Sequence, residues 1–240
     1  MISMLSQEFF ELNLAFAEKM AALVGQPLPD ALFEWTHCYL AFGLGREFYR
    51  DHPLWQDFLG GLAAAQDRAG FTYRFYLNHY RPKTPLQHAF GCFSYDPWDG
   101  GRIRLHFRDA EQPQFLPLSR ARAPVRKAEL KALFADVRAN LPQAQSVVGG
   151  SWLYHLEAYR RLFPPAFLAS ARPSPDLETR YLTLWGQFLH RDGSLRLDSA
   201  ARFRRCFEQK NTPSEALGCF PLSVLWLEAP LDVFYTHYCV

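Results

Sequence analysis

The 240-residue chain has no long apolar run and little net charge. A helix that crosses a bilayer needs roughly 20 consecutive apolar residues, and no stretch approaches that length, so we predict no membrane partner. The net charge of +2 is too small to indicate nucleic acid. The N-terminus carries Glu8 and has no basic flank, which is not typical of a signal peptide. These absences favour a cytoplasmic protein.

Cysteines are few, and their spacing is unsuited to cross-links or metal. Five are present, at Cys38, Cys92, Cys206, Cys219 and Cys239, and no two are separated by only two residues. An odd number at this spacing argues against a disulfide framework and against a zinc ribbon. We therefore expect reduced thiols, as in a reducing cytoplasm, and no bound metal.

Apolar and aromatic residues are abundant. Hydrophobic residues make up 49% of the chain and aromatic residues 16%, which is enough to bury a full core. Large aromatic side chains can fill such a core, and they can also line an apolar pocket. The composition therefore predicts a folded protein and leaves open whether its aromatic residues serve packing or ligand binding.

Periodicity predicts a mixed α+β fold, with helices before Pro82 and Pro85 and strands mostly after them. We expect a helical part over residues 1–85 and an α/β part over residues 86–240, packed together as one cooperative unit because the first helices are apolar on several faces. Expected helices cover residues 7–24, 31–44, 53–69, 124–140, 152–162 and 198–209, expected strands cover 88–95, 102–107, 145–148, 180–190 and 221–228, and 71–80 fits either.

The segment Gly149-Gly150-Ser151 is the first candidate site, because a predicted strand precedes it and a predicted helix follows it. Two glycines let the backbone turn with its N–H groups exposed, and a helix N-terminus adds partial positive charge. This arrangement predicts a cradle for an anion or phosphate. The alternative is an ordinary tight turn in which Ser151 caps the helix.

The next residues supply polar and aromatic groups beside that turn. His155 can act as a general base near neutral pH, and Tyr154 is a second candidate for proton transfer. Trp152 can contact a substrate. The alternative is that Trp152 and Tyr154 pack against the sheet, and that His155 has no acidic partner to orient its ring.

Two further segments carry open alternatives. A glycine inside the expected strand 180–190 indicates a bulge, which would place Trp185 and Gln187 beside an opening in the sheet as substrate-binding residues. The bulge can equally serve only to shape the sheet. A basic run follows residue 119 and can meet an acidic ligand or form the solvated face of a helix; it comprises Arg120, Arg122, Arg126, Lys127 and Lys131.

Residues 102–190 resemble the GNAT-like acyltransferase-domain family found in uncharacterised bacterial proteins. The shared features are Ile103-Arg104-Leu105-His106-Phe107, Pro117-Leu118-Ser119, Asn140-Leu141-Pro142, Ser151-Trp152-Leu153, Leu162-Phe163-Pro164 and Gly186-Gln187-Phe188. The resemblance implies acyl transfer from an acyl-coenzyme A to an amine or similar acceptor. The usual pyrophosphate-binding pattern (Gln or Arg, two residues, Gly, one residue, Gly or Ala) is absent, and Gly149-Gly150 would stand in for it.

The sequence thus predicts an acyl-coenzyme A-dependent acyltransferase of unknown acceptor. In it Gly149, Gly150 and Ser151 would hold the coenzyme, and His155 or Tyr154 would take the proton of the acceptor. The alternatives are a non-catalytic binding protein with an aromatic-lined pocket for an apolar ligand, and a protein-interaction module.

Overall fold

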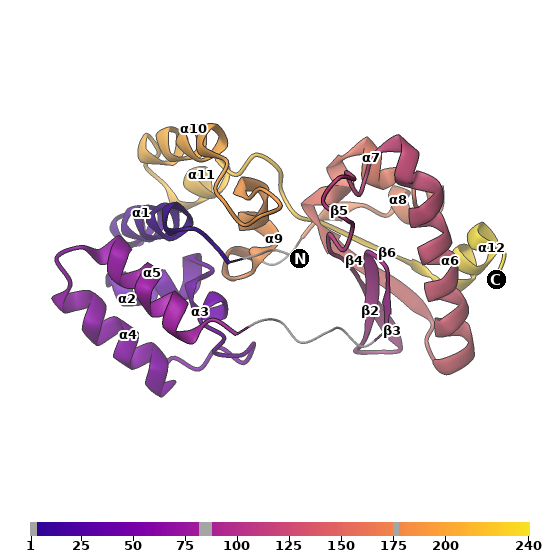
Figure 1. Ribbon diagram of the computed structural model, residues 1–240, viewed down its shortest axis with the longest axis horizontal. Helices are drawn as coiled ribbons and strands as arrows, with labels where there is room; N and C mark the ends of the chain where they lie inside the picture. Colours follow the sequence, from indigo (N-terminus) through magenta and orange to yellow (C-terminus); the bar gives the residue numbers. More distant parts are fainter. Residues whose placement is uncertain (1–3, 82–87, 175–177) are drawn as a thin grey trace. The chain divides into compact units, whose positions relative to one another are not determined.

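The computed structural model describes residues 4–81, 88–174 and 178–240 (Figure 1). The α+β prediction is confirmed, since helices accompany a mixed sheet in the order β1-β2-β3-β4-β6-β5. The chain divides into two compact units. One, the helical unit, comprises Ile2–Lys83 and Leu177–Leu222, and the other, the sheet unit, comprises Thr84–Asp176 and Ser223–Val240. The single predicted boundary at residue 85 is therefore incomplete, because 177–222 belong with the N-terminal helices.

The helical unit begins as predicted. Helix α1 (Gln7–Val24) follows Ser6 and ends at Gly25, whose φ of 72° is the left-handed conformation that glycine adopts without strain. The predicted helix 31–44 is interrupted, because the Thr36 hydroxyl donates to the Leu32 carbonyl where the helix ends. The remaining helices are α2 (Leu28–Trp35), α3 (Cys38–Ala41), α4 (Pro53–Ala64), α5 (Arg68–His79), α9 (Leu182–Trp185), α10 (Leu197–Glu208) and α11 (Pro213–Leu217).

Two predictions about this unit are corrected. Residues 180–190 form no long strand but helix α9 between the short 3-10 turns η3 (Glu178–Arg180) and η4 (Gly186–Phe188). The buried apolar positions there are 184, 185, 188 and 189, a helical spacing rather than the alternation of a strand. A disulfide joins Cys206 on α10 to Cys219 after α11, so the expectation of fully reduced thiols is wrong for this pair.

In the sheet unit, β2 (Phe93–Trp98) and β3 (Arg102–Phe107) form a hairpin joined through Gly100 and Gly101, both of positive φ, and β3 has the predicted bounds. The predicted helix 152–162 is replaced by the 3-10 turn η2 (Trp152–His155) and the short α7 (Glu157–Arg160). The other elements are β1 (Ala89–Phe90), η1 (Arg120–Arg122), α6 (Ala123–Asn140), β4 (Ser146–Ser151), α8 (Pro165–Ala169), β5 (Arg172–Pro173), β6 (Leu225–Pro230) and α12 (Leu231–Tyr238).

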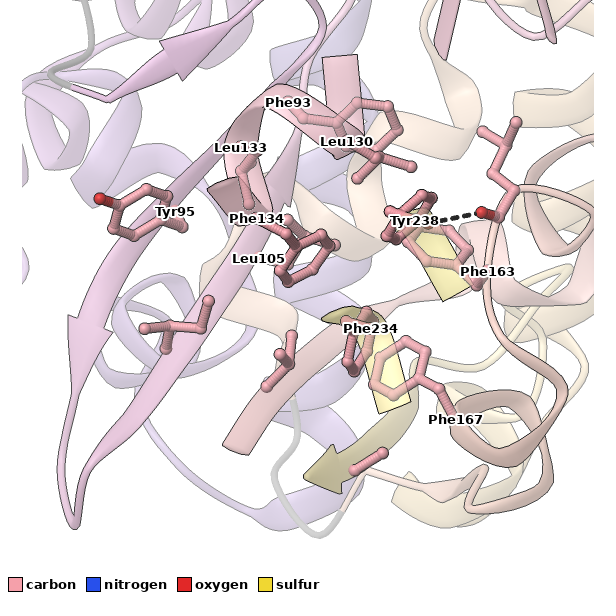
Figure 2. Packing of buried hydrophobic residues seen from close by; sticks show 14 of the residues in the cluster. Phe93, Tyr95, Leu105, Leu130, Leu133, Phe134, Phe163, Phe167, Phe234 and Tyr238 are labelled. Atoms are coloured by element: carbon pink, nitrogen blue, oxygen red, sulfur yellow. Dashed lines mark hydrogen bonds between the residues drawn. The ribbon is translucent and has the colours of Figure 1, made fainter. Parts of the chain in front are cut away.

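Helix α6 crosses over from β3 to the parallel strand β4, and the other neighbouring strands of the sheet are antiparallel. The helices of this unit lie on one face of the sheet, where the apolar side chains of the strands meet them (Figure 1). Figure 2 shows the centre of this core, where the Phe134 ring of α6 lies 4.7 Å from Phe234 and 5.3 Å from Tyr238. The Tyr238 hydroxyl donates to the Leu162 carbonyl at 2.6 Å.

Candidate functional site

The predicted anion cradle is not formed. Gly149, Gly150 and Ser151 belong to strand β4, where they pair with Leu227, Trp226 and Leu225 of β6. A strand in a ladder places its N–H groups in the plane of the sheet rather than converging them on one ligand atom. The turn that would expose several amides together is therefore absent. The alternative for Ser151 is confirmed, because its hydroxyl accepts a hydrogen bond from the Leu153 amide at the start of η2.

Gly149 and Gly150 each lack a side chain for a different structural reason. Successive residues of a strand face opposite sides of the sheet. A Cβ at Gly149 would lie 2.1 Å from the Tyr154 hydroxyl oxygen in the core, and a Cβ at Gly150 would lie 3.3 Å from the Trp226 ring on the other face. Each glycine thus leaves room for an aromatic ring from another segment.

This difference predicts unequal effects of two adjacent substitutions. Gly149→Ala is expected to lower the free energy of unfolding by about 1–3 kcal/mol, because the buried Tyr154 ring has little room to move. Gly150→Ala is expected to cost less than about 1 kcal/mol beyond propensity effects, because only a few tenths of an ångström of Trp226 movement is required. Urea unfolding of both variants checks this, and equal losses would contradict it.

The two predicted proton carriers are poorly placed for catalysis. Tyr154 is 3% exposed, and burial raises the pKa of its phenol, so the group stays protonated near neutral pH. His155 is exposed, and its Nε2 lies 3.1 Å from the Ser223 carbonyl oxygen and 3.4 Å from the Ser223 hydroxyl. No carboxylate contact orients the ring among the interactions of the described residues. Trp152 is half-buried beside them.

Trp185 and Gln187 belong to the helical unit, whereas Gly149, Gly150, Ser151 and His155 belong to the sheet unit. Trp185 is fully buried, and its indole N–H donates to the Thr179 carbonyl at 2.7 Å. The Gln187 amide donates to the Leu222 carbonyl and accepts from the Leu222 amide, both at 2.9 Å. Their polar groups thus hold the local chain together, and the substrate-binding role of these two residues stays a prediction.

The basic run after residue 119 is not a uniform solvated face. Arg126 is only 2% exposed and contacts Glu129 at 2.6 Å and Glu111 at 3.2 Å, while Arg122 contacts Glu111 at 2.5 Å. The Arg122 hydrogen bond lowers the pKa of Glu111, and burial raises the pKa of Glu129. These contacts connect the start of α6 to the preceding loop, so this part of the run is structural.

The sheet face opposite the helices carries a different set of side chains, here called the polar face. Register places these residues side by side on neighbouring strands. From β2 across the sheet to β5 they are Ser94, Asp96, Trp98, Arg102, Arg104, His106, Ser146, Val148, Gly150, Trp226, Glu228 and Arg172. The polar face therefore combines tryptophans, arginines and two carboxylates on a rigid platform.

Aromatic and cationic groups alternate across this face. The Arg104 guanidinium lies 4.7 Å from the Trp98 ring and 5.8 Å from the Trp226 ring, within the range of cation–π attraction. Trp226 sits over Gly150, and Arg172 of β5 is directly opposite it. Trp98 is 37% exposed, Trp226 is half-buried and Arg172 is exposed.

Both carboxylates of the polar face have polar partners. Asp96 lies 2.9 Å from Nε2 of His106, and Glu228 accepts a hydrogen bond from the Ser146 hydroxyl at 2.9 Å. Their negative charge is thus partly satisfied within the face. Arg102, Arg104 and His106 alternate with apolar residues in the sequence, but no local signal indicates that Trp226, far along the chain, lies beside Arg104.

One shallow hollow of about 420 Å³ lies between the start of α8 and α12. Its lining contains no Phe, Tyr or Trp, so it is not the aromatic-lined pocket that the sequence predicted as an alternative. Within residues 4–81, 88–174 and 178–240, no helix is long and apolar enough to cross a membrane. In the same ranges, no three His, Cys, Asp or Glu residues are grouped as metal ligands would be.

The polar face is thus a surface on which tryptophan, arginine and carboxylate side chains of neighbouring strands lie together. Comparison of the chain with protein-family models, curated proteins and solved structures finds no match.

Proposed function

We propose that this protein is a binding protein that takes its ligand on the polar face of the sheet unit. The observation that carries the proposal is the row Trp98, Arg104, Trp226 and Arg172 across four strands. Tryptophan and arginine contribute large shares of the energy at many recognition surfaces, because both combine a broad contact area with directional polar groups.

The rigidity of the platform also supports recognition. The row is held by paired strands rather than by loops, and β6 pairs with β4 from Leu225 to Pro230. The backbone beneath these side chains is held in place before a ligand arrives, and this reduces the entropic cost of binding.

Acyl transfer from a coenzyme A thioester is the second candidate, and one feature favours it. Pairing of the parallel strands β3 and β4 ends at Leu105 and Gly149, while β3 continues to Phe107 and β4 to Ser151. Ligands of α/β sheets often bind beyond the carboxyl ends of parallel strands. Gly150 and Ser151 would then contact the acyl donor from these ends.

A ligand screen with the full chain tests the first proposal. The probes are adenosine 5′-monophosphate, coenzyme A, palmitate, an acidic peptide and a ten-residue oligothymidine, each followed by thermal shift of parent protein and the Trp226→Ala variant. Stabilisation of the parent by at least one probe, lost in the variant, is expected. If none of the probes shifts the melting temperature, or if the shifts are the same in Trp226→Ala as in the parent, the proposal is overturned.

The second candidate needs a separate readout. Parent protein is incubated with acetyl-coenzyme A and a panel of primary amines, and release of the free thiol is measured. Amine-dependent thiol release that is lost in His155→Ala would establish acyl transfer and replace the binding-only proposal. Release equal to that of a protein-free control would leave recognition as the function.

A further inference from the structure

We propose that the polar face binds a nucleoside phosphate, with its base against Trp226 and its phosphate on Arg172 or Arg104. The inference rests on the proposed function, because it names the ligand class for the same surface. It starts from the half-buried Trp226, which pairs with Gly150 of β4 on one side and with Arg172 of β5 on the other.

Trp226 offers a stacking surface in a fixed position. The absence of a side chain at Gly150 lets the edge of the six-membered ring lie over β4, and the Arg104 guanidinium lies near the same glycine. A tryptophan placed in this way can stack against a planar aromatic ring, and such stacking is sequence-tolerant because every nucleobase has a π-face.

The charge of the face favours an anion. Arg102, Arg104 and Arg172 lie on it, whereas Asp96 and Glu228 have His106 and Ser146 as partners. The planar guanidinium fork of arginine matches phosphate oxygens. Among the described interactions, no carboxylate contacts the exposed Arg172.

The combination selects one class of ligand. An apolar ligand would not need the arginines, and inorganic phosphate would not need the tryptophan. Trp226 and Arg172 are directly opposite each other on paired strands about 4.8 Å apart, so one small ligand can contact both side chains. Mononucleotides and coenzyme A share this chemistry.

The test is a calorimetric titration of the full chain. The probes are adenosine 5′-monophosphate, coenzyme A, adenosine, inorganic phosphate and a ten-residue oligothymidine. Adenosine 5′-monophosphate is expected to bind at least tenfold more tightly than adenosine or phosphate alone. Binding of coenzyme A but not of the mononucleotide would place the recognised group elsewhere on the coenzyme and would contradict the proposal, and tighter binding of the oligothymidine would replace it with a nucleic-acid surface.

Variants decide whether the polar face is the site. Arg172→Gln on the exposed short strand is expected to weaken mononucleotide binding about tenfold, and Trp226→Ala by about 5- to 100-fold. The matched control is Arg205→Gln on α10, another exposed arginine, which belongs to the helical unit and should change nothing. Unchanged affinity in Arg172→Gln and in a folded Trp226→Ala would overturn the proposal.

The titration also distinguishes failure of the nucleoside-phosphate inference from failure of the proposed binding function. If the mononucleotide does not bind at 1 mM (roughly 4 kcal/mol of binding free energy at the 1 M standard state), the inference fails. The proposed function would still stand if the acidic peptide or palmitate binds in a way that depends on Trp226.

Discussion

Replacing Phe134 with alanine is expected to lower the free energy of unfolding by about 3–5 kcal/mol. The side chain is fully buried, and its ring lies against Phe234 and Tyr238 of α12 (Figure 2). These contacts close the core between α6 and α12, so the cavity left by the substitution has aromatic walls on more than one side. Urea unfolding followed by circular dichroism measures the loss.

The control is Leu116→Ala, because Leu116 is 75% exposed and should contribute less than about 0.5 kcal/mol. A loss below about 1 kcal/mol for Phe134→Ala would show that α12 does not pack on α6 as described. A large loss in both variants would indicate that the Leu116 loop is also part of the core.

Removal of the Cys206–Cys219 disulfide is expected to lower the free energy of unfolding by about 3 kcal/mol. The cross-link spans a sequence separation of 13 residues, and closing a loop of that size removes this much chain entropy from the unfolded state. The measurement is urea unfolding of the Cys206→Ser/Cys219→Ser double variant beside the oxidised parent. Cys239→Ser, at an exposed free thiol, is the control and should have little effect.

The Cys206–Cys219 disulfide itself is checked by alkylating the unfolded, unreduced protein and measuring its mass by mass spectrometry. Modification of the three free cysteines, Cys38, Cys92 and Cys239, is expected. Modification of all five would show that the pair is reduced, and the stability prediction would then lose its basis. An intact bond would also argue against a strongly reducing compartment.

The same two changes test the sequence-based prediction of one cooperative unit. Phe134 belongs to the sheet unit and the disulfide to the helical unit. In a single cooperative transition, both changes lower the same midpoint, whichever unit is observed. Two transitions, each shifted by only one of the changes, would show that the units unfold independently.

Local sequence signals were sufficient to predict helices and strands whose conformation depends on residues within the segment itself. Helix α1 lies between Ser6 and Gly25, and the β2–β3 hairpin has glycines at its turn and alternating residues in β3. Capping, positive φ and hydrophobic period act over a few residues, so they can be recognised without knowing the partner segment.

The sequence-based predictions were wrong where one sequence pattern is compatible with two tertiary structures. Gly149-Gly150 has the composition of a turn, yet it lies in a strand because Tyr154 and Trp226 occupy the space beside it on opposite faces. Residues 180–190 alternate loosely enough to suggest a strand, but burial of 184, 185, 188 and 189 selects helical turns. The position of the Trp226 ring and the buried side of residues 180–190 depend on segments distant in sequence.

The sequence by itself determined the α+β class, helices α1 and α6 and strand β3, because these follow from interactions within short segments. Only the tertiary structure placed residues 177–222 with the N-terminal helices, joined Cys206 to Cys219, and brought Trp226 beside Arg104 on the polar face. Which distant residues lie side by side depends on chain crossings and strand register. These in turn depend on how the whole apolar core is buried rather than on any local pattern.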